Sequence, residues 1–447
     1  MDTLCSRMLL FLGLAPFMTL AATPPPTHQF TLENGLQVLV REDHRAPLVT
    51  SQLWFKVGPA DEAPGQTGLS HVLEHMLFKG SSKTCADEAS RILESIGAEE
   101  SAFTYADATS YQQTLAPRYL GVVFELMADL MSTAHLHADD LSTEMAVIRE
   151  ERHLRTDDNV NAAVLEHFSA LAHFANSYRT PVIGWMHDLQ QVDAGELRHW
   201  YESRYAPGNA VLVIVGDVTL AQVQPLAERY FGVLAKRSVP RLPSPVELKV
   251  PGERQLTLHR EVPAAQLLMA FNVPGLATAK DPRTVHALRL INAILGGANG
   301  ARLQQKLMFT DRVFNRIDTV YNQMTRGDSL LLLTAELADP PLTDLAGAQA
   351  RVWAQIDALR TTPPSQEELE RARTQLIAQQ VYASDSIQQQ ARQLASYPTI
   401  GLPWRLLDED AETLAKVTPE QIRDAAALWL TRERLGVAHV HKAAANE

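Results

Sequence analysis

The residues with the clearest chemical potential are His71, Glu74 and His75, which form the pattern H-x-x-E-H. On a helix the two histidines lie on one face, one turn apart, with Glu74 close to the same face. Two imidazoles in this arrangement can bind one zinc ion, and the carboxylate can accept a proton from a water molecule on the metal. The same residues also occur together by chance on solvated helices, so the pattern alone leaves both interpretations open.

The residues around this pattern favour the metal site. The segment is otherwise apolar, with Leu69 before the motif and residues 76–78 after it. Buried histidine and glutamate side chains are costly unless they are paired or bound to metal. The chain has only two cysteines, Cys5 and Cys85, and Cys5 lies in a segment that is predicted to be removed. Histidine and carboxylate are therefore the remaining ligand types.

A catalytic zinc site needs a third protein ligand and an open position for water. A predicted helix around residues 144–151 offers two carboxylates, because Glu144 and Glu151 are seven residues apart and share a face. The alternative is a solvated charge run, in which the glutamates and arginines of residues 149–152 pair among themselves. Spacing alone does not choose between the two.

The composition limits the class of protein. The chain has 447 residues, 46% hydrophobic and 21% charged, as in a globular protein of roughly two to four domains. The net charge of −12 argues against a nucleic-acid partner.

Residues 1–22 read as a signal peptide, with Arg7, an apolar run over 8–20 and small residues at its end. The run is too short to span a bilayer comfortably, although an uncleaved anchor is the alternative. We expect a periplasmic or otherwise exported protein, with no stable membrane span after signal removal.

The elements that must position the motif follow from periodicity and turn signals. Asn34-Gly35 predicts a hairpin between residues 29–32 and 36–40. Further strands are predicted at 51–57, 101–104, 110–115 and 210–215. The motif helix ends at Gly80. Other helices of this half are predicted at 86–96, 117–134, 142–155, 162–175 and 196–205.

The second half repeats this order after a proline-rich linker at 236–252. Strands are predicted at 255–259, 266–272, 329–336 and 435–441, and helices at 285–295, 345–360, from 365 and at 419–430. Strands followed by helices, twice over, predict two copies of an α+β domain, at 28–235 and 253–443. The second copy has no H-x-x-E-H, so only the first half can hold the metal.

The sequence resembles the pitrilysin/insulinase superfamily of zinc peptidases, in its half-length bacterial and mitochondrial-processing-peptidase-like branch. That family has H-x-x-E-H, about 75 residues, and then a ligand glutamate with a second glutamate seven residues earlier. Here residues 76–150 lie between His75 and Glu151, and Glu144 precedes Glu151 by seven. Further matches span Gly68–Gly80, Phe103–Tyr111, Tyr178–Gly184 and Tyr205–Asp217.

The resemblance implies one zinc ion per chain, with His71, His75 and Glu151 as its ligands. It implies that Glu74 is the general base and that Glu144 orients a ligating histidine. The implied fold is a pair of homologous α/β-roll domains, each a mainly antiparallel sheet packed with helices, which together form one half of a clamshell. Such a chamber would favour peptides or unfolded polypeptides as substrates of a zinc endopeptidase.

Two departures from the family pattern change these expectations. The strand thought to pair with substrate usually begins with asparagine, and here it reads Ser101, Ala102, Phe103, Thr104. Pairing through the main chain should survive this change. Complete members also carry an arginine and a tyrosine, seven apart, which hold the substrate; in this chain those places align with Met308 and Asn315.

The missing pair predicts a homologous partner subunit that supplies it, in a heterodimer, with a homodimer as the alternative. A non-catalytic structural or chaperone-like subunit is the competing function, and a passive zinc store is a third. The intact set of His71, Glu74, His75 and Glu151 speaks against the non-catalytic alternative.

Overall fold

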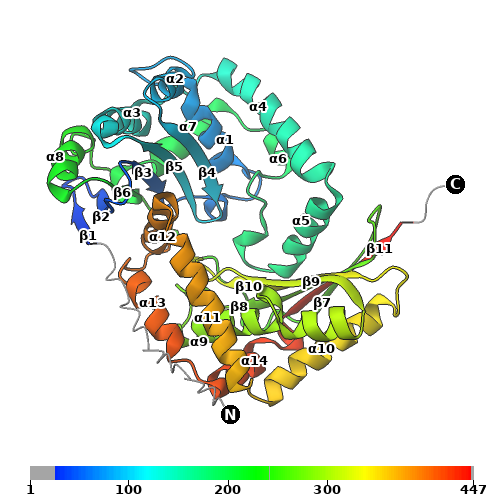
Figure 1. Cartoon of the computed structure of the whole chain (residues 1–447). Coiled ribbons are helices and arrows are strands. Elements are labelled where there is room, and N and C mark those ends of the chain that lie inside the picture. Colours follow the sequence, from blue (N-terminus) through cyan, green and yellow to red (C-terminus); the bar gives the residue numbers. More distant parts are fainter. Residues whose placement is uncertain (1–25, 241, 444–447) are drawn as a thin grey trace, which may run out of the picture.

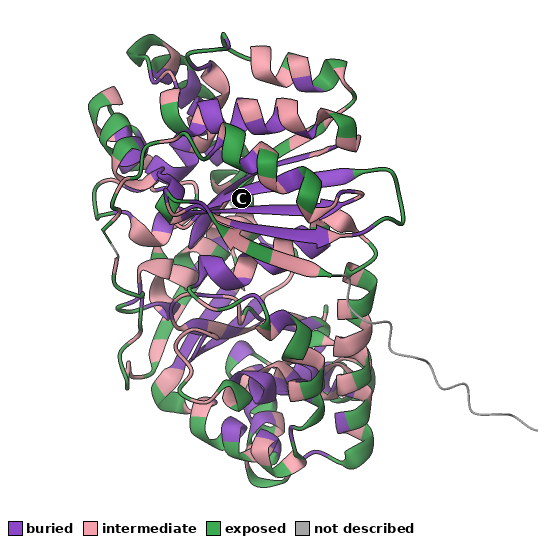
Figure 2. Ribbon diagram, turned by 90° about the vertical axis from the view of Figure 1, so that its left-hand side faces the viewer, coloured by how far each residue is buried: buried purple, intermediate pink, exposed green. Residues whose placement is uncertain are grey.

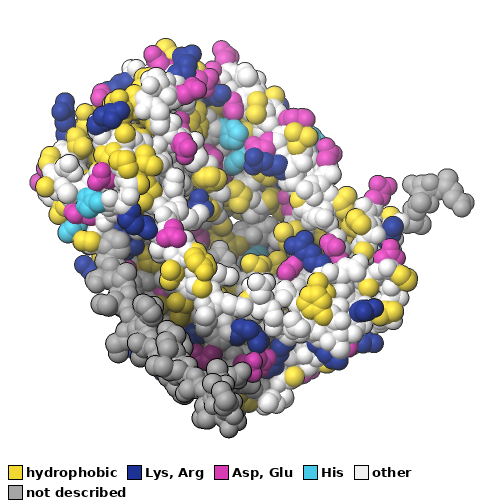
Figure 3. Space-filling view, in the orientation of Figure 1, with side chains coloured by type: hydrophobic (Ala, Val, Ile, Leu, Met, Phe, Trp, Pro, Cys, Tyr) yellow, Lys and Arg dark blue, Asp and Glu magenta, His cyan; other side chains and the backbone are white. Residues whose placement is uncertain are grey.

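The computed structural model describes residues 26–240 and 242–443. Each half of the chain builds one sheet with its helices, and the halves face each other across a hollow (Figures 1 and 3). Buried residues concentrate in the strands and on the helix faces turned toward them (Figure 2). The predicted signal at 1–22 lies outside the described residues. Within the described part of the chain, no helix combines the length and hydropathy needed to cross a membrane.

The first half contains a six-stranded mixed sheet with the order β1-β2-β6-β3-β5-β4. Its strands are β1 (Thr27–Thr31), β2 (Gln37–Glu42), β3 (Val49–Phe55), β4 (Glu99–Tyr105), β5 (Ala108–Leu115) and β6 (Ala210–Gly216). Its helices are α1 (Leu69–Met76), α2 (Glu88–Ser95), α3 (Leu120–Thr133), α4 (Ala138–Arg152), α5 (Val160–Ala172), α6 (Met186–Leu189), α7 (Ala194–Arg204) and α8 (Leu220–Tyr230). β6 is buried along its whole length, as its unbroken valine-rich sequence predicts for a strand covered on both faces.

The second half contains a five-stranded mixed sheet with the order β7-β11-β8-β10-β9. Its strands are β7 (Arg254–Arg260), β8 (Gln266–Val273), β9 (Phe314–Tyr321), β10 (Ser329–Leu337) and β11 (Leu435–Lys442). Its helices are α9 (Pro282–Asn292), α10 (Leu345–Thr361), α11 (Gln366–Ala383), α12 (Ile387–Thr399), α13 (Leu406–Ala415) and α14 (Pro419–Trp429).

The two sheets follow the same plan. β7, β11, β8, β10 and β9 stand in the order of β2, β6, β3, β5 and β4. In each sheet one neighbouring pair is parallel, β2 with β6 and β7 with β11, and the other pairs are antiparallel. The predicted fold class is confirmed: two α/β domains with mainly antiparallel sheets packed with helices. The exact domain boundaries stay predictions.

In each half, one helix packs against the sheet of the other half. α5 packs on β7, β8 and β11, where Phe168 and Ala172 are fully buried. α12 packs on β3 and β6, where Ala391 and Leu394 are fully buried. A single apolar core therefore joins residues from both halves at each crossing, and the halves are held together by side-chain packing as well as by the linker.

Candidate metal centre

The N-terminus of α1 is fixed by contacts with residues outside the helix, which helix propensity does not predict. Gly68 has φ +94°, and a Cβ there would lie 2.8 Å from the carbonyl oxygen of Ile183. The Glu62 carboxylate accepts hydrogen bonds from the Gly68 and Ser70 amides, both at 2.7 Å. These bonds satisfy amide groups that have no partner within the helix, and they fix where α1 begins.

α1 and α4 bring together the side chains of His71, His75 and Glu151, the three residues that the family resemblance implies as ligands. Glu151 Oε2 lies 3.8 Å from His71 Nε2 and 3.4 Å from His75 Nε2. One ligand atom of each residue lies within 4.8 Å of the others, so the three could hold a single metal ion. Glu151 occupies the last turn of α4, which packs on α1.

The chemistry of this donor set fits zinc. Burial, together with the nearby His75 and Arg155, lowers the pKa of His71 to about 3, so the imidazole is neutral at ordinary pH. A neutral imidazole can donate a lone pair to a metal. Two imidazoles and one carboxylate form a common set in catalytic zinc sites, which leave a position open for water.

Glu144 contacts the histidine that it was predicted to orient. Its Oε1 lies 2.9 Å from His75 Nδ1, and its Oε2 accepts from Lys79 Nζ at 2.7 Å. Burial alone would raise the pKa of Glu144, but the bonds from Lys79 and His75 hold it below its ordinary value. An ionised Glu144 favours a proton on Nδ1, which turns the lone pair of Nε2 toward the cluster.

Glu74 lies beside the cluster with one defined partner. The Thr104 hydroxyl of β4 donates a short hydrogen bond to Glu74 Oε2. Burial raises the pKa of Glu74 above its ordinary value, although the Thr104 bond opposes this. A carboxylate with a raised pKa is a better proton acceptor and donor near neutral pH.

Three contacts of this site were not predicted from sequence. Lys79 stands four residues after His75, and this spacing is a signal that could have placed it on the same helical face. Arg155 Nη1 lies 2.6 Å from Glu151 Oε1, again at a spacing of four. The bond from Thr104 to Glu74 had no sequence signal, because it depends on the packing of β4 against α1.

The predicted substrate strand is the edge of the first sheet. β4 pairs with β5, and no other strand within residues 26–240 and 242–443 joins its outer edge. Ser101 and Phe103 are exposed, whereas Ala102 and Thr104 are half-buried, so alternate side chains face opposite ways. The free edge can therefore accept an extended peptide through main-chain hydrogen bonds.

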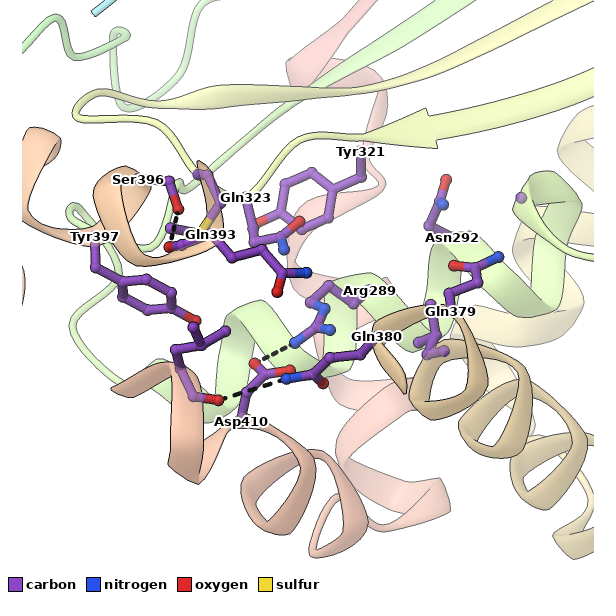
Figure 4. A pocket seen from close by; sticks show the side chains of 14 residues that line it. Arg289, Asn292, Tyr321, Gln323, Gln379, Gln380, Gln393, Ser396, Tyr397 and Asp410 are labelled. Atoms are coloured by element: carbon purple, nitrogen blue, oxygen red, sulfur yellow. Dashed lines mark hydrogen bonds and ion pairs between the residues drawn. The ribbon is translucent and has the colours of Figure 1, made fainter. Parts of the chain in front are cut away.

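The second half contains a polar cavity (Figure 4), and residues 242–443 contain no group of three metal-binding side chains. The cavity measures about 320 Å³ and is lined by Arg289 and Asn292 of α9, Tyr321 of β9, Gln379 of α11 and Asp410 of α13, among others. Arg289 Nη1 is bonded to Asp410 Oδ1 at 2.5 Å. The lining has one carboxylate and no histidine, so it lacks a zinc-binding donor set.

Met308 and Asn315, the residues that the sequence analysis aligned with the family's arginine and tyrosine, carry neither a cationic nor a phenolic group. Met308 lies in the π-helical segment Gln304–Thr310, and Asn315 is exposed on β9. Tyr321 lies at the other end of β9, and its hydroxyl donates a hydrogen bond to the carbonyl oxygen of Pro274 at 2.7 Å.

Comparisons with known proteins agree with this arrangement. Residues 37–184 match the family model described as Insulinase (Peptidase family M16), and residues 191–376 match the Peptidase M16 inactive domain. Zinc protease PqqE of Helicobacter pylori is 28% identical over 351 residues, which cover 77% of this chain and 78% of that protein. The beta subunit of mitochondrial-processing peptidase from Lentinula edodes is 23% identical over 379 residues, 82% of this chain and 79% of that subunit.

Solved structures share the fold. The crystal structure of a protease from Helicobacter pylori superposes with a TM-score of 0.86 at 24% identity, over 93% of this chain and 99% of that chain. The periplasmic protease PqqL from Escherichia coli superposes with a TM-score of 0.78 at 17% identity, over 94% of this chain but only 48% of that chain.

Proposed function

The chain belongs to the M16 (insulinase) family of peptidases, and from that premise we propose that it is a zinc-dependent endopeptidase. The observation that carries this proposal is the convergence of His71, His75 and Glu151 with Glu74 beside them. These three residues would hold one zinc ion per chain, and Glu144 would orient His75. When bound, zinc supplies a Lewis acid that lowers the pKa of a water molecule and polarises a peptide carbonyl.

Glu74 performs the proton transfers of this reaction. It accepts a proton from the attacking water and returns it to the leaving amine, which is general base and then general acid catalysis. Its raised pKa, caused by burial, favours both steps near neutral pH. Thr104 holds the carboxylate in place through Oε2, so Oε1 remains to face the reacting water.

The substrate is a peptide or an unfolded polypeptide. The free edge of β4 supplies main-chain donors and acceptors for an extended chain, along Ser101, Ala102, Phe103 and Thr104. The hollow between the two halves is visible in the space-filling view (Figure 3), and it suits an extended chain better than a folded protein.

A homologous partner subunit completes the enzyme. The second half carries Met308 and Asn315 where the family's substrate-holding arginine and tyrosine align, so a second subunit would supply that pair. We propose a heterodimer, with a homodimer as the alternative, in the periplasm or otherwise outside the cytoplasm.

The test is the substitution Glu74→Gln, with Glu150→Gln as its control. Glu74→Gln should keep zinc at one ion per chain and abolish peptide cleavage, because the amide cannot accept the proton. Glu150 is exposed next to Glu151, and its substitution should leave both quantities unchanged. Cleavage by Glu74→Gln at the wild-type rate would refute the assignment.

The same assay separates the competing functions. It is carried out with the zinc-loaded chain alone and together with a homologous subunit that carries the arginine and tyrosine. Bound zinc without cleavage in every pairing would favour a non-catalytic subunit or a zinc store over a peptidase.

A further inference from the structure

One arginine of the second half reaches into the first half. Arg326 lies in the loop between β9 and β10, and its guanidinium forms ion pairs with Asp61 and Asp107. Its Nε is 3.4 Å from Asp107 Oδ1, and its backbone N–H donates to Asp107 Oδ2 at 3.0 Å. The Asp61 side chain is 1% exposed and that of Asp107 is 9% exposed, so this charge cluster lies in the interior.

Asp61 connects Arg326 to the helix that carries Glu74. Asp61 ends a short 3-10 helix and accepts a hydrogen bond from the Gly58 amide at 3.1 Å. The next residue is Glu62, whose carboxylate holds the first amides of α1 at 2.7 Å. Asp61 is therefore one peptide bond away from the residue whose side chain holds the start of α1.

Asp107 connects Arg326 to the strand that contacts Glu74. Asp107 lies in the tight turn between β4 and β5, and the Tyr178 hydroxyl donates to its Oδ2 at 2.5 Å. The Ala60 amide donates to the Ala106 carbonyl at 2.9 Å, which ties this turn to the segment before α1. Thr104, three residues before Asp107, donates to Glu74.

We propose that Arg326 is a positioning residue, which holds the segment before α1 and the β4–β5 turn together so that Thr104 meets Glu74. The proposal rests on the proposed function, because it assigns an effect on the base of that reaction. A guanidinium suits this role, since its planar fork can bind two carboxylates at once, whereas an ammonium acts as a point charge. Without it, Asp61 and Asp107 would remain buried with unbalanced charge.

A structural role in the second half alone is the competing explanation, and Arg289 provides the matched control. Arg289 also forms an internal ion pair, with Asp410, but that pair lies between α9 and α13 (Figure 4). Both arginine side chains are largely buried, 17% exposed at Arg326 and 13% at Arg289. Arg289→Met should therefore disturb the second half without moving Glu74.

The first measurement is hydrogen–deuterium exchange on the full chain loaded with zinc. Arg326→Met should speed the exchange of backbone amides in residues 58–70 and 104–108, and Arg289→Met should not. Arg326→Lys keeps one charge and should give an intermediate effect, and it also serves as the comparison if Arg326→Met does not fold. Unchanged exchange in both segments for the Arg326 variants would overturn the proposal.

The second measurement is steady-state peptide cleavage by the same variants, with the partner subunit present where the wild type needs one. Arg326→Met should lower kcat by about 10- to 100-fold, as expected when a catalytic group is misplaced by up to 1 Å. KM and zinc content should stay at their wild-type values, and Arg289→Met should keep the wild-type kcat. If Arg326→Met keeps the wild-type kcat, Arg326 does not position Glu74. If the wild-type protein itself cleaves no peptide, the proposed function is refuted, and the exchange measurement alone decides the role of Arg326.

Discussion

At the scale of single residues, the candidate metal site is surrounded by side chains that are not among its three candidate ligands. His75 bonds to Glu144, and Glu144 is held on its other oxygen by Lys79, whose pKa is raised by that bond. These two hydrogen bonds keep Glu144 ionised and fix the rotation of the His75 imidazole ring. Such outer partners set the basicity and the direction of a ligand, so they contribute to metal affinity without touching the metal.

Replacing Lys79 tests this chain of contacts. Lys79→Met should weaken zinc binding by about 10-fold, because Glu144 loses its partner and orients His75 less firmly. Lys83→Met is the control, since Lys83 forms an exposed ion pair with Glu125 away from the cluster. Competition with a chromophoric zinc chelator measures both affinities. Equal affinities in the two variants would show that Lys79 has no part in metal binding.

The spacing of a helix explains which of these residues could be predicted. His71, Glu74 and His75 lie within one turn and a half, so their geometry follows from the sequence alone. Lys79 follows the same periodicity and was still missed. Thr104 and Arg326 could not be placed, because their contacts with Glu74 and Asp61 join segments that are distant in sequence and depend on packing.

At the scale of elements, the position of α1 depends on one close backbone approach. Gly68 and Gly184 each have a positive φ and leave no room for a Cβ between the segments that they join. Arg152, next to Glu151, donates to the Gly184 carbonyl at 2.8 Å and pairs with Glu166 of α5. The start of α1 and the end of α4 are therefore anchored to the same loop, which fixes the candidate ligands of the two helices relative to each other.

Substitution of Gly68 tests this anchoring. Gly68→Ala should lower the free energy of unfolding by about 2–3 kcal/mol, because the new Cβ meets the Ile183 carbonyl and the positive φ is strained. It should also weaken zinc binding, since α1 must shift. Gly65→Ala is the control: Gly65 has φ +87° with nothing within 4 Å of a Cβ, so it should cost only about 1 kcal/mol. Urea unfolding and zinc titration measure the two effects, and identical results for both glycines would rule out the close approach as the cause.

Most elements could be predicted, but their partners could not. The Asn34-Gly35 hairpin and the buried strand β6 follow from local turn chemistry and from an unbroken apolar run. The sequence did not predict β9, α6, α8, α12 or α13. α8 contains Pro225 and α12 contains Pro398, and proline is unfavourable inside a helix. The apolar face of α5 was predictable from its pattern, whereas its packing against the sheet of the other half was not, because periodicity indicates only that a face is buried.

At the scale of the whole molecule, α5 and α12 each pack against the sheet of the other half. The contacts around α12 include titratable groups as well as apolar ones. Asp43 follows β2 of the first half, and its carboxylate accepts from Gln390 of α12 at 2.8 Å and from Arg45 at 2.7 Å. The Arg45 guanidinium, assisted by Gln390, lowers the pKa of Asp43 to about 2. Acid should therefore weaken the contact between α12 and the first sheet.

The sign of this effect follows from linkage. The pKa of Asp43 is lower in the folded chain than its ordinary value of 3.8, so the ionised group stabilises the fold above pH 3.8 and loses this contribution as the pH falls toward 2. Asp43→Asn should lower the free energy of unfolding by about 1 kcal/mol at pH 7, after allowance for solvent screening. The difference from wild type should shrink between pH 5 and pH 2.

Asp385→Asn is the matched control, because Asp385 contacts the same Arg45 at 3.4 Å but is 79% exposed. Its substitution should change the free energy of unfolding by less than about 0.5 kcal/mol at any pH. Urea unfolding at pH 7, 5 and 3 measures all three proteins. If the gap between wild type and Asp43→Asn stays constant across this range, Asp43 does not hold α12 against the first sheet through its charge, and apolar packing by residues such as Leu394 alone joins the halves there.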